Sequence, residues 1–367
     1  MVGRGRYLII GFVVMCFNSL YQYTWNVLGP LLGRQLGVGA VLVAAGFSIY
    51  VVVSTLAQPA GGGFADIKGP KVVGVVSSVL SALGFLGAAL SPNIALLYLF
   101  WALGSAGEGV LYGIAFNLAV KWFADKMGLA TGLVSLGFGL GSAIANPIIA
   151  KIGNFKEATL AIGLIELAVL PALTAMADYP KGLAGKSPVQ AARDLRFWLL
   201  YASYILGSVP LLTLASSLQF LSSGAELVAL ASVYPLLVGL ARPLFGKIAD
   251  AWGVMNALYI ALTASMLGSA LFALGLKAAG TAVIGLFGGS LILLYLNASS
   301  RIFGAKYATA NNGILYTAKA AGGVLGSLAF SYIYAAAGAE ASIAFVMASA
   351  ALALVLLIAV SRIRRPE

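Results

Sequence analysis

Long apolar stretches separated by short polar segments follow one another along the whole chain. Each stretch has roughly 20 residues or more, enough for a helix to cross about 30 Å of hydrocarbon. The stretches are continuously apolar and do not alternate with a period of two, which predicts helices and not the strands of a barrel. The first stretch is too long, and is followed by too many others, to be a cleaved signal peptide. We expect twelve membrane-spanning helices, at residues 7–32, 40–66, 71–91, 94–121, 127–151, 157–177, 197–221, 226–250, 255–276, 279–302, 309–337 and 340–362.

A short motif is written twice in the sequence, half a chain apart. Residues 57–69 read AQPAGGGFADIKG and residues 241–253 read ARPLFGKIADAWG, and the two align without a gap at an offset of 184 positions. Such a repeat predicts a duplicated unit whose two halves share one topology. The positions that match include Gly62 and Gly246, Asp66 and Asp250, and Gly69 and Gly253.

The longest polar stretch lies between the sixth and seventh apolar segments. It contains a proline, several glycines and mixed charge, a composition typical of a linker. We therefore expect an N-terminal six-helix bundle over residues 1–177, a cytoplasmic linker over 178–196 and a C-terminal six-helix bundle over 197–367. Two repeated bundles of six helices are typical of secondary transporters, which bind their substrate between the halves near the middle of the membrane.

The composition agrees with a membrane protein and indicates its orientation. The chain is 61% hydrophobic and 9% charged, with a mean hydropathy of +1.00, outside the usual range of soluble domains. If the N-terminus is cytoplasmic, sixteen of the 22 Lys and Arg residues fall in inner segments and four in outer segments. The positive-inside rule then predicts a multi-pass protein of the cell membrane with both termini in the cytoplasm. Because this bias accounts for the net charge of +11, the charge gives no reason to expect nucleic-acid binding.

The residue types that carry much of enzyme chemistry are scarce. The chain has no histidine and one cysteine, so a zinc or haem site, a disulfide framework and an acid–base relay have little to build on. No serine stands in a G-x-S-x-G setting, and the sequence has no filter-like segment or charged ring typical of a channel. We expect neither an enzyme nor a metal or cofactor site.

The duplicated motif has the form G-x-x-A-D-x-x-G and resembles the signature loop of the major facilitator superfamily. The resemblance implies the major facilitator fold, an all-α membrane protein with 12 transmembrane helices in two pseudo-symmetric six-helix bundles, and a monomer. The glycines permit tight turns and close helix contact, while the aspartates can accept from helix N-terminal amides or pair with a cation in one conformational state. The expected conformational-switch loops comprise Gly62, Asp66, Gly69, Gly246, Asp250 and Gly253.

Four further stretches resemble the oxalate:formate antiporter and its monocarboxylate-transporter relatives. They read YQYTWNVLGPLL at 21–32, KWFADKMGLATGL at 121–133, KSPVQAARDLRFWLL at 186–200 and NNGILYTAKAAG at 311–322. The resemblance implies that Lys319, in Y-T-A-K, and Arg242, in A-R-P, bind a carboxylate. It also implies a cavity lined by Gln22, Tyr23, Tyr112 and Tyr316.

The same two cations stand out on physical grounds. They occur in one half only, since Gln58 and Val134 stand at the positions that match Arg242 and Lys319. Arg242 comes eight residues before Asp250, or about 12 Å inside the helix end, and Lys319 lies at a comparable depth. A charge there costs about 2.5–3.5 kcal/mol unless it faces water or a partner. An anion between the two cations would stabilise both, through paired hydrogen bonds from Arg and a mobile charge on Lys. The alternative is that each cation pairs permanently with a buried acid.

Two acids lie within apolar segments, Glu108 in the fourth and Glu166 in the sixth. Glu108 shares a helical face with Tyr112 and departs from the small residues of the family pattern. Because a buried carboxyl holds its proton more tightly, Glu108 is a candidate for proton coupling, with an ion pair or hydrogen bond inside the bundle as the alternative. The chain lacks the aspartate that proton-coupled monocarboxylate transporters have four residues before the arginine, where Val238 stands. Glu166 is expected to be structural, since sixth spans usually pack outside the pore.

The sequence thus predicts a secondary active transporter of small carboxylates, such as oxalate, formate or lactate-like organic anions, by alternating access. Its expected partners are the small carboxylate held by Arg242 and Lys319, the lipid bilayer and, if Glu108 titrates, protons. Two alternatives stay open: a proton-coupled monocarboxylate symporter that uses Glu108, and a major facilitator exporter of another substrate class. A cation-drug exporter is disfavoured, because it would place acids and not two bases in its cavity.

Overall fold

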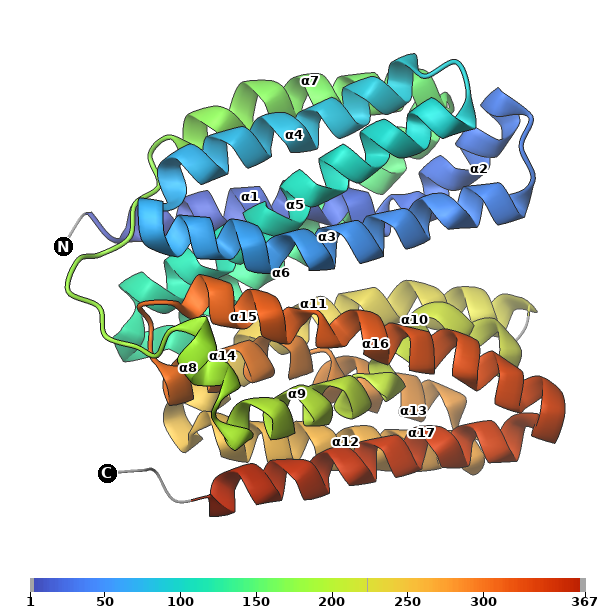
Figure 1. The fold of residues 1–367 in the computed structure, drawn as a ribbon. Coiled ribbons are helices and arrows are strands. Elements are labelled where there is room, and N and C mark those ends of the chain that lie inside the picture. Colours follow the sequence, from blue (N-terminus) through green and yellow to red (C-terminus); the bar gives the residue numbers. More distant parts are fainter. Residues whose placement is uncertain (1–2, 223, 364–367) are drawn as a thin grey trace. The chain divides into compact units, whose positions relative to one another are not determined.

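The computed structural model describes residues 3–222 and 224–363 (Figure 1). Within these residues all regular secondary structure is helical, as continuously apolar segments in a membrane require. Both chain ends, including Arg364 and Arg365, lie outside the described residues. The all-helical architecture expected from the sequence is confirmed.

The expected spans coincide with helices, although several of the helices are interrupted. By length and composition, eight helices of the described residues are apolar and long enough to cross a membrane, or nine if the bent pair near the N-terminus is one span. The longest of them, residues 308–362, contains two of the expected spans and changes direction at Gly338, whose φ is +83°. The helices α3 (Ala40–Lys68) and α11 (Gly224–Trp252) coincide with two more; each has 29 residues, or about 43 Å at 1.5 Å per residue.

The chain divides into two compact units. Unit 1 comprises residues 1–124, 133–185 and 305–314, and unit 2 comprises residues 125–132, 186–304 and 315–367. Each unit therefore includes one short segment from the half of the sequence that forms most of the other unit. These two segments, 125–132 and 305–314, contain the beginnings of helices α6 (Met127–Ile152) and α15 (Ala308–Tyr316).

Unit 1 is a helical bundle in which α4 packs along two neighbours, α5 and α7, and α5 also packs along α3 (Figure 1). The buried face of α4 is rich in glycine, alanine and serine, small residues that allow helices in a membrane to approach closely. An aromatic cluster around Tyr21, Phe85 and Trp101 fills the space beside this contact. The unit is built from α1 (Gly5–Tyr23), α2 (Trp25–Leu36), α3, α4 (Pro70–Leu90), α5 (Ile94–Trp122), most of α6, and α7 (Phe155–Thr174).

Unit 2 contains the interrupted spans. The seventh span is divided at Ser208, and the tenth and eleventh contain the π-helical segments η2 (Ile284–Gly288) and η3 (Leu325–Ala329). Such segments are rare in helices and occur often at functional sites. The helices that lie mainly in this unit are α8 (Pro188–Ala192), α9 (Leu195–Gly207), α10 (Val209–Leu221), α11, α12 (Val254–Ala273), α13 (Lys277–Val283), α14 (Leu291–Phe303), α16 (Ala318–Val324) and α17 (Phe330–Arg362).

The linker ends in a charged cap at the start of α9. The Asp194 side chain accepts from the backbone N–H of Arg196 at 3.1 Å, and its other oxygen pairs with the Arg196 guanidinium at 2.7 Å and with Lys186 Nζ at 2.8 Å. The Lys186 backbone N–H in turn donates to the Phe303 carbonyl at 2.7 Å. Residues 186–196 are thereby fixed to the end of α14 within unit 2.

Candidate functional site

Arg242 lies in the middle of a long helix of unit 2. It stands ten residues before α11 ends at Trp252, which is about 15 Å along the axis, and the residue is 5% exposed. The backbone beside it packs against the segment 125–132, because a Cβ atom at Gly132 would lie only 2.6 Å from the Arg242 carbonyl oxygen. Glycine at 132 thus allows a close backbone contact at the depth of the arginine.

Lys319 lies in α16, at a similar depth in unit 2. It stands eleven residues after α15 begins, or about 17 Å along the axis, and is 8% exposed. Its Nζ donates to the Tyr316 hydroxyl at 3.0 Å and lies 5.1 Å from the centre of that ring. Between them, the Thr317 hydroxyl lies 2.9 Å from the hydroxyl of Tyr201 at the junction of α15 and α16. The structure therefore brings Lys319 and Tyr316 together.

The other cavity candidates lie in unit 1 and form one neighbourhood. Tyr23 and Tyr112 each make an edge-on contact with the ring of Phe138, at 5.5 Å between ring centres. Gln22, beside Tyr23, accepts at Oε1 from the Tyr50 hydroxyl at 3.4 Å. Gln22, Tyr23 and Tyr112 are thus brought together through two residues, Tyr50 and Phe138, that the sequence did not single out.

Glu108 is buried between helices of the same unit, with an exposed fraction of 1%. Its Oε2 accepts from the Ser54 hydroxyl at 2.6 Å. Glycines flank it on both sides: a Cβ at Gly109 would lie 2.0 Å from the Ser54 carbonyl oxygen, and one at Gly107 would lie 2.4 Å from the Ser77 carbonyl oxygen. The stretch G-E-G therefore lets α5 approach α3 and α4 closely enough to enclose the carboxyl between them.

The first switch loop fixes Asp66 to a helix start. Asp66 Oδ1 pairs with Lys121 Nζ at 2.6 Å, and Oδ2 accepts from the Ala310 backbone N–H at 2.8 Å, near the beginning of α15. Both partners belong to unit 1. Glycine at 62 avoids a steric clash, because a Cβ there would lie 2.6 Å from the Thr309 carbonyl oxygen. Gly69 ends α3 with a φ of +87°, a conformation that favours glycine.

The second switch loop repeats this geometry within unit 2. Both carboxylate oxygens of Asp250 accept backbone N–H groups at the start of α6, from Gly128 and Leu129 at 2.8 Å each. Such amides form a natural site for a negative charge. A Cβ at Gly246 would lie 2.1 Å from the Gly128 carbonyl oxygen, and Gly253 ends α11 with a φ of +88°.

Two cations that complete these loops were not singled out from the sequence. Lys121 pairs with Asp66, and Arg301 pairs with Asp250 at 2.8 Å. The two are 180 positions apart, close to the offset of the motif, and each stands near the end of its span. The offset of the repeat would place Lys121 opposite Ala305 or Lys306 and not Arg301, so the alignment alone does not find this pair.

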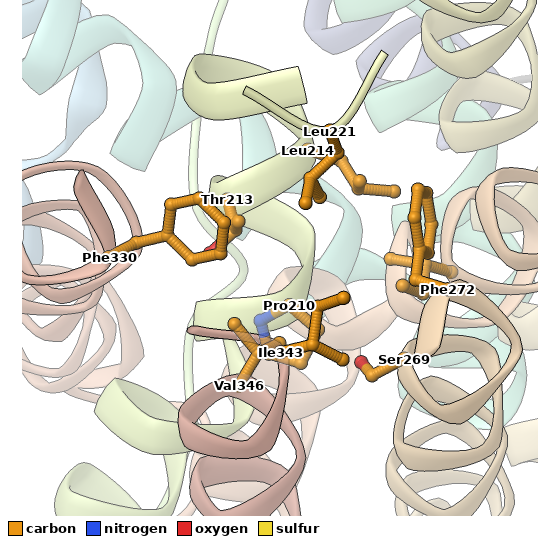
Figure 2. Close-up of a pocket in the computed structure, with 10 residues that line it drawn as sticks. Pro210, Thr213, Leu214, Leu221, Ser269, Phe272, Phe330, Ile343 and Val346 are labelled. Carbon is orange, nitrogen blue, oxygen red and sulfur yellow. The ribbon is translucent and has the colours of Figure 1, made fainter. Parts of the chain in front are cut away.

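A cavity within unit 2 differs in character from these sites. Figure 2 shows its mainly apolar lining. None of its lining residues carries a charge, so it is poorly suited to a carboxylate. The residues that line it are Pro210, Thr213, Leu214, Leu221, Ser269, Phe272, Ile284, Phe330, Ile343 and Val346.

Comparison with known proteins places these features in a family context. A model of the Major Facilitator Superfamily matches residues 8–276. An uncharacterized 38 kDa protein in a 23S RNA operon of Thermoproteus tenax is 66% identical over 335 residues, which cover 91% of this chain and 90% of that protein. The oxalate:formate antiporter of Oxalobacter formigenes is 28% identical over 348 residues, which cover 88% of this chain and 83% of the antiporter.

The fold has a solved counterpart. The crystal structure of the human organic anion transporter MFSD10 (TETRAN) matches with a TM-score of 0.76 at 15% identity, over 97% of this chain and 99% of that chain. The fold and the resemblance to the oxalate:formate antiporter that the sequence indicated are confirmed.

Proposed function

The chain belongs to the major facilitator superfamily, whose members are membrane transporters and not enzymes, and from this premise we propose that it carries small carboxylates across the cell membrane by alternating access. Arg242 and Lys319 hold the anion. The observation that supports this most strongly is the burial of both cations within unit 2, Arg242 in the long helix α11 and Lys319 at the start of α16. The orientation proposed has both termini in the cytoplasm, and the working form is a monomer.

Burial at this depth needs a compensating interaction. Cations inside membrane helices are rare and generally face a protein interior or a water-filled path, where they mark the route of a substrate or ion. A small carboxylate matches the two donors chemically. The Arg242 guanidinium can form two parallel hydrogen bonds to its oxygens, and the Lys319 ammonium adds a charge on a flexible stem.

Tyr316 adds selectivity to the lysine. Its hydroxyl is held 3.0 Å from Lys319 Nζ, so an anion that reaches the ammonium also meets a phenol group and the face of an aromatic ring. In unit 1, Tyr23, Tyr112 and Gln22 offer hydroxyl and amide groups beside aromatic rings. Such mixed linings orient a small planar acid through a few polar contacts. The names of the oxalate:formate antiporter and the organic anion transporter support the same substrate class.

A second candidate is proton-coupled symport of a monocarboxylate. The observation that favours it is Glu108, a buried carboxyl one helical turn from Tyr112 that accepts from Ser54. An exchanger of anions has no need of a titratable group in this place, whereas a symporter does.

Ligand-dependent thermal unfolding of the purified full-length protein tests the anion site. Formate, oxalate, acetate and lactate are added to wild type, Arg242→Gln and Lys319→Gln, with Lys247→Gln as a matched control because Lys247 is exposed on the same helix as Arg242. At least one acid is expected to stabilise wild type and Lys247→Gln. Losing one partner of a buried charge pair costs about 2–5 kcal/mol, so affinity in the other two variants should fall by roughly 30-fold or more. Equal stabilisation of all four proteins would refute the proposed site.

Proteoliposomes separate the two coupling modes. Uptake of a labelled carboxylate is measured against an internal carboxylate or against a pH gradient. Exchange predicts uptake that needs internal anion and is insensitive to Glu108→Gln. Symport predicts uptake that follows the pH gradient and loses that dependence in Glu108→Gln.

A further inference from the structure

Glu166 is a fully buried acid of unit 1, with an exposed fraction of 0% on α7. Its Oε2 accepts from the Ser81 hydroxyl at 3.0 Å. Its Oε1 is buried and has no hydrogen-bond partner among the described residues, and no described Lys or Arg forms an ion pair with it. A carboxylate with one lone acceptor contact and no cation is expensive to bury, whereas a neutral carboxylic acid is not.

Ser81 joins Glu166 to the centre of the bundle. The Ser81 carbonyl oxygen accepts from the Tyr21 hydroxyl at 2.6 Å. That hydroxyl occupies a gap between α4 and α5 that only glycines leave open, since a Cβ at Gly84 or Gly104 would lie 2.1 Å from it. Three helices besides α7 thus meet around one serine.

Glu108 approaches the same stretch of α4 from the other side. Its neighbour Gly107 packs so tightly on α4 that a Cβ there would lie 2.7 Å from the Ser81 backbone nitrogen. Glu166 and the residue before Glu108 therefore both contact Ser81. Two carboxylates buried around the same stretch of α4 would repel each other, and a proton on one of them relieves that repulsion.

No ion pair with a described Lys or Arg takes the place of a proton on Glu166. The helices packed against α7 are α4, α1 and α2. Among the described residues of these helices, Tyr21 of α1 faces Glu166, and Glu108 faces it from α5. Lys71 of α4 and Arg34 of α2 are exposed at their helix ends.

We propose that Glu166 and Glu108 form a proton-binding site inside unit 1, with the proton on Glu166 at neutral pH. Binding converts the Glu166 carboxylate to a carboxylic acid, with the new O–H bond formed from a hydronium ion that leaves as water. Glu108 is the second member of the site, and its carboxyl accepts from the Ser54 hydroxyl at 2.6 Å.

Two hydroxyl groups of α3, one helical turn apart, contact Glu108 and Gln22. Ser54 donates to Glu108 at 2.6 Å, and Tyr50 donates to Gln22 Oε1 at 3.4 Å. Gln22 is only half-buried.

Infrared difference spectroscopy of the folded full-length protein, recorded over a pH series, tests the site directly. Wild type should show the C=O stretch of a protonated carboxyl at neutral pH. Glu166→Gln should lose it, while Glu108→Gln and the control Glu157→Gln, an exposed acid on the same helix, should keep it. A band that persists in Glu166→Gln, or one that disappears in Glu108→Gln alone, overturns the assignment.

Ser81→Ala keeps the test decisive if Glu166→Gln does not fold. This variant removes the single described donor to Glu166 without touching either acid. The band should stay but move to the higher frequency of a carboxyl that has lost a hydrogen bond. An unchanged frequency means that the band arises elsewhere and contradicts the proposal.

The role of this proton in transport rests on the proposed function. In the symport mode, with a pH-sensitive dye inside the proteoliposomes, carboxylate uptake by wild type should move protons, and Glu166→Gln should move carboxylate with proton movement reduced at least tenfold. Carboxylate uptake by wild type without proton movement overturns the coupling role. Proton movement at the wild-type ratio in Glu166→Gln overturns the coupling role. If wild type moves no carboxylate, the proposed function fails, whereas the infrared result still decides the proton site.

Discussion

Asp66 and Asp250 occupy matching positions in the repeat but have different surroundings. The side chains of Asp66 and Lys121 are 0% and 1% exposed, whereas those of Asp250 and Arg301 are 17% and 35% exposed. Lys121 also donates to the Lys306 carbonyl at 2.9 Å and lies 4.0 Å from the centre of the Tyr179 ring. The first pair is therefore shielded from water, and its electrostatic interaction is correspondingly stronger.

This difference predicts unequal effects of the same substitution. Asp66→Asn leaves the Lys121 charge buried without its counter-ion and should lower the free energy of unfolding by about 3–5 kcal/mol. Asp250→Asn removes a partly exposed ion pair and one of two hydrogen bonds from a helix start, and should cost about 1–2 kcal/mol. Denaturant unfolding in detergent measures both. Adding Lys121→Met to Asp66→Asn should recover much of the loss, and a double variant as unstable as the single one would contradict the explanation.

A second contrast lies between neighbouring glycines of α3. A Cβ at Gly62 would lie 2.6 Å from the Thr309 carbonyl oxygen, whereas one at Gly63 would have nothing within 4 Å. Gly62→Ala should therefore cost about 1–3 kcal/mol of stability through overpacking, and Gly63→Ala should be neutral or stabilise the helix by up to about 1 kcal/mol. Thermal unfolding of the two variants compares them. Equal effects would show that the contact at Gly62 relaxes without cost.

At the scale of elements, the sequence was informative where one local property dominates. Continuous apolarity identified the all-helical architecture, although the described residues contain eight or nine helices apolar and long enough to cross a membrane and not twelve. The repeated motif identified two aspartates that each accept from a helix start. The division of the seventh span at Ser208 and the π-helical turn at 325–329 were not foreseen, because Gly and Ser in these stretches are equally compatible with a continuous membrane helix. The hydrogen bond from the Ala310 backbone N–H to Asp66 could not be predicted either, because every residue except proline has a backbone N–H and the sequence does not show which one is used.

Glu166 illustrates the same limit for the candidate sites. The sequence placed it in the sixth span and assigned it a structural role. Its neighbour Ser81 comes from another helix, and the glycines at 84, 104 and 107 that close the bundle around it look like ordinary membrane-helix glycines until the helices are packed. Buried carboxyls can be located from the sequence, but which of them lacks a counter-charge follows from tertiary contacts alone.

The start of α9 allows a prediction on pH. Hydrogen bonds from Arg196, and then from Lys186, hold the pKa of Asp194 well below its usual range. A carboxyl whose pKa is lower in the folded than in the unfolded chain stabilises the protein at pH values above its unfolded pKa of about 3.9. This contribution disappears as the pH falls through the folded pKa. Asp194→Asn keeps a side-chain oxygen for the cap but removes the charge.

The expected loss of stability in Asp194→Asn is about 0.2–1 kcal/mol near neutral pH, because the pair is partly exposed. The difference from wild type should stay constant down to about pH 5 and shrink below about pH 4. Thermal unfolding across this range measures it. A difference that grows on acidification would mean that the charge on Asp194 does not stabilise the linker.

At the scale of the whole molecule, the two exchanged segments connect the repeat to the proposed transport cycle. Segment 305–314 supplies the amide that Asp66 accepts, and segment 125–132 supplies the amides that Asp250 accepts. Each switch loop thereby holds a helix start that comes from the other half of the sequence. If these loops switch as the family resemblance implies, the proposed cycle would release these hydrogen bonds in one of its states.

Both switch loops lie on the cytoplasmic side of the membrane in the proposed orientation. Labelling of introduced cysteines tests this orientation.

The native Cys16 is first replaced in Cys16→Ala. Lys181→Cys in the linker and Lys156→Cys at the start of α7 are matched substitutions at exposed positions. The excess of Lys and Arg in the linker and its equivalents predicts that Lys181→Cys faces the cytoplasm and Lys156→Cys faces outward. A membrane-impermeant maleimide should therefore label Lys156→Cys in intact cells, and Lys181→Cys after permeabilisation alone. The opposite pattern would invert the topology, while leaving the helical fold and the paired motif contacts as they are.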